Sequence, residues 1–227
     1  MWQKHFILLE KIFATLFFFI PIVPFIITKN SEMIIAYVTF LAILAALFRE
    51  KILSYYFPPL LEIRLAEAPH HFAIVPGVHP VTGNPAGDVA VIGILVENIG
   101  FTPAKNVMVL FNGIESNMVI NMNRYCSLPL IRSWSRPQET RVNFIPPKTP
   151  IRFSICYTTS SAPQIFDFEF LQKPNALSSI NCPINQKTTF KFETKAIADN
   201  SKAVSSMIEI EFMGNYIHGL NIKMLDC

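Results

Sequence analysis

The chain has 227 residues, and its formal net charge of +3 arises mostly near the N-terminus. Residues 59–227 carry 14 Lys and Arg against 13 Asp and Glu, and this near-neutral balance excludes a domain that grips nucleic acid over a broad basic surface. Seventeen prolines, only eight glycines and twenty phenylalanines favour short strands joined by stiff turns.

Two apolar runs without a charged residue, Ile12–Ile27 and Met33–Phe48, lie near the N-terminus. Each has 16 residues, slightly fewer than the roughly 17–25 of a membrane-spanning helix, so flanking residues must extend both. With those flanks the runs predict a transmembrane helical hairpin over residues 1–58, with spans at about 6–27 and 33–52. A cleaved signal peptide and a buried core hairpin explain the two runs less well.

The first run contains the residues on which activity in a membrane would depend. Pro21 and Pro24 break a helix, and non-helical backbone is tolerated at membrane depth only where protein or water satisfies it. A re-entrant first segment beside one spanning helix is therefore the alternative to the hairpin. Together with Phe17, Phe18 and Phe19, these prolines are the candidate membrane-segment residues.

The distribution of Lys and Arg predicts the orientation of the hairpin. The turn between the runs carries only Lys29, whereas the opposite side would carry five basic residues: Lys4, Lys11, Arg49, Lys51 and Arg64. Because cytoplasmic flanks are rich in Lys and Arg, both termini and the C-terminal domain are expected in the cytoplasm. Thiols stay reduced there, so we expect unpaired cysteines at Cys126, Cys156, Cys182 and Cys227.

Residues 59–227 predict one β-rich domain without a helix. Alternating or branched apolar patterns indicate strands at Leu60–Ala66, Asp88–Asn98, 107–112, Asn117–Asn123, Asn143–Pro147, Ile151–Tyr157, Ile165–Leu171, Thr188–Thr194, Met207–Met213 and Tyr216–Met224. We expect a loop over His70–Pro85 and a two-residue hairpin turn at Gly214 and Asn215. Such a series of short strands predicts an antiparallel sandwich or barrel.

The stretch VENIGFTPAKNV at residues 96–107, followed later by PPKTPIRFSI, resembles the crossing between the second and third strands of immunoglobulin-like sandwiches in bacterial membrane-anchored proteins. The resemblance covers about a third of the domain. It implies a fold class in which a transmembrane hairpin precedes an antiparallel immunoglobulin-like β-sandwich.

This combined architecture is similar to the two-transmembrane membrane effectors of bacterial anti-phage systems, such as retrons and cyclic-nucleotide-activated systems. The resemblance implies a toxin of the bacterial inner (plasma) membrane, whose hairpin perturbs the bilayer under control of the β-sandwich. It also implies a protein partner in the same system, which could be a nucleoprotein complex, and a homo-oligomer in the membrane. The alternative is a non-catalytic, membrane-anchored scaffold or interaction module of an envelope complex.

No motif for catalysis, a cofactor or a metal is present in the sequence. His70, His71 and His79 lie close together, but no Cys or carboxylate partner follows them at a fixed spacing. Cys156 lies in a strand pattern without a neighbouring histidine, which favours an inert buried thiol over a nucleophile. We therefore expect a protein that is not an enzyme.

The segment from Arg124 to Arg141, RYCSLPLIRSWSRPQETR, has a composition suited to binding a partner. Arg and Trp are frequent at interface hot spots, and Arg also binds phosphates while Trp stacks on bases. A solvated loop whose Trp tucks into the sandwich is the alternative. The candidate partner-binding residues are Arg124, Arg132, Trp134, Arg136 and Arg141.

Overall fold

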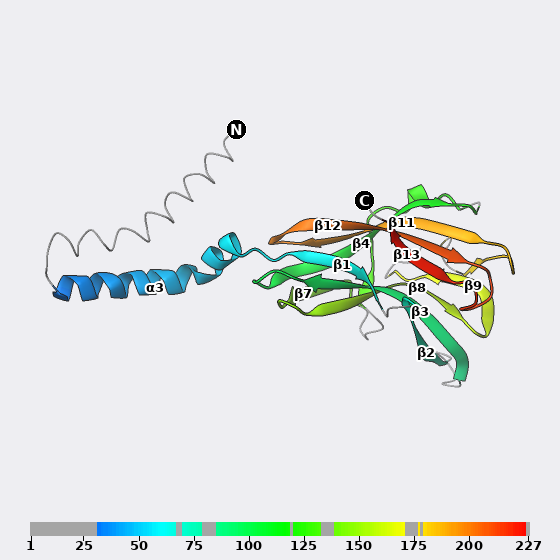
Figure 1. Cartoon of the computed structure of the whole chain (residues 1–227), viewed down its shortest axis with the longest axis horizontal. Coiled ribbons are helices and arrows are strands. Elements are labelled where there is room, and N and C mark those ends of the chain that lie inside the picture. Colours follow the sequence, from blue (N-terminus) through cyan, green and yellow to red (C-terminus); the bar gives the residue numbers. More distant parts are fainter. Residues whose placement is uncertain are drawn as a thin grey trace. The chain divides into compact units, whose positions relative to one another are not determined.

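A computed structural model describes most of the chain and divides it into two compact units, Met1–Tyr56 and Phe57–Cys227. The described residues are 31–66, 70–78, 85–118, 120–132, 139–170, 177 and 179–225. Figure 1 shows a helix in the first unit and two layers of strands in the second.

The described part of the first unit is helix α3 (Ser31–Tyr56), which has 26 residues. The charged residues Arg49, Glu50 and Lys51 lie inside this helix, so its uninterrupted apolar stretch remains Met33–Phe48, shorter than a span requires. Among the described residues, no helix combines the length and apolar character needed to cross a membrane.

The predicted transmembrane hairpin is therefore wrong, and so is the inner-membrane localisation that was derived from it. The first predicted span, with Phe17, Phe18, Phe19, Pro21 and Pro24, lies outside the described residues.

The second unit is mainly β and consists of two antiparallel sheets. Sheet A has the order β1-β3-β8-β9-β10, with β2 beside β3 and β6 beside β8. Its strands are β1 (Leu61–Leu65), β2 (Phe72–Val78), β3 (Pro85–Asn98), β6 (Ile131–Arg132), β8 (Pro150–Thr159), β9 (Ala162–Phe168) and β10 (Ile180–Asn181).

Sheet B has the order β13-β12-β11-β4-β5, with β7 also beside β4. Its strands are β4 (Ala104–Ser116), β5 (Leu128–Pro129), β7 (Arg141–Ile145), β11 (Thr188–Ala198), β12 (Ser201–Phe212) and β13 (Asn221–Leu225). A short 3-10 helix, η1 (Met122–Arg124), follows β4.

Phenylalanines from both sheets fill the space between them. Alternation along β11 buries Phe190 and Phe192 and turns the residues between them outward. Phe190 stacks on Phe166 of sheet A with ring centroids 5.0 Å apart, and Phe192 stacks on Phe111 at 4.8 Å. Phe111 also meets Phe168 of sheet A edge-on at 5.4 Å. These ring contacts join the two sheets through one core.

The chain crosses from sheet A to sheet B between β3 and β4, at a corner fixed by the buried side chain of Asn98. Its Nδ2 donates to the carbonyls of Thr102, at 2.7 Å, and Ile145, at 3.0 Å. Its Oδ1 accepts from the backbone N–H groups of Gly100, at 3.1 Å, and Leu60, at 3.3 Å. All four hydrogen-bonding positions of this amide are therefore occupied.

Two further contacts tighten the same corner. The hydroxyl of Thr102 donates to the carbonyl of Phe57 at 2.7 Å. A Cβ at Gly100 would lie 2.5 Å from the nitrogen of Leu60 and 2.6 Å from the oxygen of Pro58, so only glycine fits.

The structure corrects the predicted loop over His70–Pro85, because β2 pairs there with the first half of β3. The sequence of this segment is rich in Pro, Gly and His, and it is too polar and too interrupted to show the pattern of a strand. Pro76 is accommodated because β2 lies at an edge of the sheet and its register with β3 shifts between Pro76 and Val78.

Two other predicted elements are also different. In place of the predicted strand Asn117–Asn123, the described residues form a bend at Asn117 and Met118 and then η1. The buried Met122 of η1 lies so close to Gly113 that a Cβ there would be 2.2 Å from the Met122 oxygen. The predicted two-residue hairpin is a longer loop, because β12 ends at Phe212 and β13 begins at Asn221.

Replacing Asn98 with Ala should lower the free energy of unfolding of the full chain by about 3 kcal/mol, because buried donors and acceptors from three segments lose their partner. Urea denaturation monitored by far-UV circular dichroism measures this change. The matched variant Asn143→Ala removes an exposed asparagine and should change stability by less than about 0.5 kcal/mol. Equal effects of the two variants would contradict the role assigned to Asn98.

Candidate functional site

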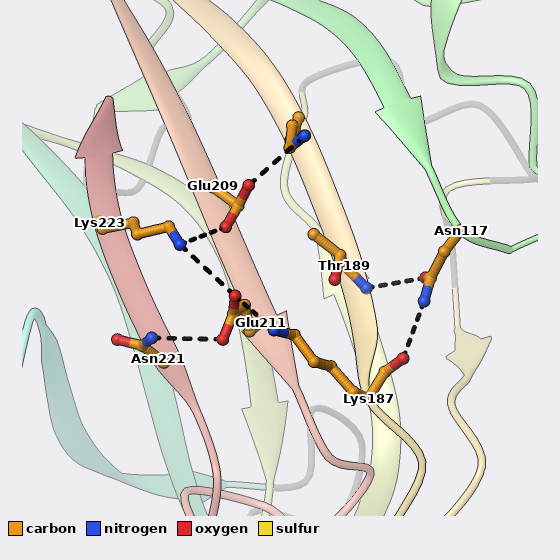
Figure 2. A network of polar contacts seen from close by, with 8 residues as sticks. Asn117, Lys187, Thr189, Glu209, Glu211, Asn221 and Lys223 are labelled. Carbon is orange, nitrogen blue, oxygen red and sulfur yellow. Dashed lines mark hydrogen bonds and ion pairs between the residues drawn. The ribbon is translucent and has the colours of Figure 1, made fainter. Parts of the chain in front are cut away.

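The outer face of sheet B carries a polar groove of about 440 Å³. We call it the polar groove, and its lining residues are Glu115, Ser116, Asn117, Lys187, Thr189, Lys191, Glu209 and Glu211. Asn117 extends the pairing of β4 with β11, since its side chain accepts from the Thr189 N–H and donates to the Lys187 carbonyl, both at 2.8 Å. Figure 2 shows these contacts beside the charged side chains of β12 and β13.

Charges of alternating sign cross the four strands in register. Glu115 of β4 lies opposite Lys191 of β11, Lys191 lies opposite Glu209 of β12, and Glu209 lies opposite Lys223 of β13. Lys191 forms ion pairs with both glutamates, that with Glu209 at 3.6 Å, and Lys223 approaches Glu209 to 2.6 Å. Cross-strand pairs of opposite charge stabilise a sheet, so this row strengthens sheet B.

Glu211 lies in the next row and is held by three partners. Lys187 approaches its carboxylate to 2.7 Å, Lys223 lies at 3.5 Å, and the Asn221 amide donates to it at 3.3 Å (Figure 2). The hydrogen bond from Lys187 is the largest cause that lowers the pKa of Glu211 from 4.5 to about 2, and the Asn221 amide adds to it against the effect of burial. Glu211 is therefore ionised at every ordinary pH.

The polar groove is poorly suited to acid–base catalysis. Glu209 and Glu211 are two residues apart on one face of β12, which places such carboxylates about 7 Å apart, within the spacing of paired carboxylates in inverting glycoside hydrolases. A general acid needs a raised pKa, whereas the pKa of Glu211 is lowered and Glu209 lies between two lysines. The glutamates and lysines of the polar groove therefore neutralise one another.

A second surface lies around the Asn98 corner and is apolar. Its most exposed side chain is Phe101, which is 78% exposed, and all of its members are at least 49% exposed. We call it the corner surface, and it consists of Phe57, Leu60, Ile99, Phe101 and Phe144.

Ring and backbone contacts bring Phe57, Leu60, Ile99 and Phe101 close together, whereas Phe144 lies on β7 of sheet B, next to a residue that bonds Asn98. The rings of Phe57 and Phe101 meet edge-on at 5.8 Å, and the Ile99 N–H donates to the Leu60 carbonyl at 2.8 Å. Phe144 precedes Ile145, whose carbonyl accepts from Asn98. The surface is thus part of the rigid corner. Elsewhere in the described part of this unit, the exposed large apolar side chains are Ile74 and Ile184.

The predicted partner-binding arginines lie on different elements. Arg124 ends η1, Arg132 belongs to β6 of sheet A, and Arg141 begins β7 of sheet B. Arg132 forms an ion pair with Glu139 at 3.1 Å. Trp134 and Arg136 lie outside the described residues.

The histidines and cysteines form no cluster in the described ranges. No group of three metal-binding side chains occurs among the residues that the structure describes, and His79 lies outside them. Cys126, Cys156 and Cys182 are free thiols, and Cys227 is not described. Burial raises the pKa of Cys182 to about 11 and that of Cys156 well above its usual value, which makes both thiols unreactive.

Comparisons with models of protein families, with curated proteins and with solved structures found no match to this chain. Its functional interpretation therefore depends on the geometry of the two surfaces.

The polar groove should make the protein sensitive to acid. The pKa of Glu211 is lower in the folded chain than the ordinary 4.5, so its contribution to stability is complete above pH 4.5 and is lost as the pH falls towards about 2. We expect Glu211→Gln and Lys187→Met each to flatten the fall in unfolding free energy over this interval. Urea titrations at a series of pH values measure it, and an unchanged acid slope in both variants would contradict the assignment.

Proposed function

We propose that this chain is a non-catalytic interaction module that binds a partner protein through the corner surface. The observation that carries the proposal is that five exposed apolar side chains, including Phe101 at 78% exposure, lie on the segments that the hydrogen bonds of Asn98 and Thr102 join. Contiguous exposed apolar surface on a folded protein marks an interaction site, because its contact with water is unfavourable until a partner covers it.

The rigidity of the corner supports this proposal. Asn98 and Thr102 hold the backbone on both sides of Phe101, and Gly100 allows close contact with the chain before β1. A surface that is already ordered loses little conformational entropy on binding, so more of the free energy from apolar burial remains as affinity. Burying one phenylalanine side chain contributes about 1.5–3 kcal/mol.

Catalysis has less support in the residues described. The paired carboxylates of the polar groove are held by lysines, and the buried thiols have raised pKa values. The anti-phage effector expected from the sequence needed a spanning hairpin, so it is not carried further. The interaction module, without a spanning hairpin, is the alternative that the observations favour.

Photocrosslinking in the cells that encode the chain tests the proposal. With p-benzoylphenylalanine in place of Phe101 in the full chain, irradiation should give a discrete adduct with another protein. The same group in place of Ile184, which is 60% exposed outside the corner surface, is the matched control. Adducts that are no stronger at position 101 than at position 184 would contradict the proposal.

A double variant separates binding from stability. Phe101→Ser with Phe144→Ser should reduce recovery of the crosslinked partner, captured through a probe in place of Leu60, at least tenfold. Because both rings are exposed, unfolding free energy should change by less than about 0.5 kcal/mol. The paired control Ile74→Ser with Ile184→Ser should leave recovery unchanged.

A further inference from the structure

We draw no further inference here: the strongest candidate, the exposed apolar face of helix α3 around Ile35, Val38 and Ile43, carries nothing because nothing in the part of the chain that the structure describes shows what covers it.

Discussion

The buried amide of Asn98 is the interaction on which the rest of the second unit depends. It joins the end of β3 to the chain before β1, to the turn before β4 and to the end of β7. These contacts set the point at which the chain leaves one sheet and enters the other, and so fix the register from which both layers continue. A buried amide with every position occupied specifies one geometry, because each alternative leaves a donor or acceptor unpaired.

The two surfaces differ in whether their side chains already have partners within the fold. In the polar groove the glutamates and lysines of neighbouring strands neutralise one another, and Asn117 and Asn221 complete the network. A ligand there would have to replace existing ion pairs. At the corner surface the apolar side chains face water, although hydrogen bonds of Asn98 hold the backbone on both sides of Phe101. The unfavourable hydration of that surface is what makes it the better candidate for binding.

Alternation along the chain was sufficient to predict most of β3, β8 and β11, but only about half of β4 and of β12. Alternation was insufficient where the position of a segment in the sheet decides whether it forms a strand. Pro76 argues against a strand until it is known to lie at an edge. The predicted strand at Asn117–Asn123 contains the 3-10 helix η1 instead, and the residue after it, Tyr125, accepts a hydrogen bond from the Gly113 N–H. The charged row of the polar groove could not be predicted either, because it depends on the register of four strands, which the pattern of a single strand does not specify.

The corner surface shows why function was harder to predict than fold. In the sequence, Phe101 stands between a glycine and a threonine in a turn, and nothing in that pattern says whether its ring turns inward or outward. The direction is decided by Asn98 and Thr102, whose hydrogen bonds reach residues more than forty positions away. Of the arginines that look functional in the sequence, Arg132 is already paired with Glu139, and the exposed side chain on which our proposal depends, Phe101, belongs to no motif that the sequence offers.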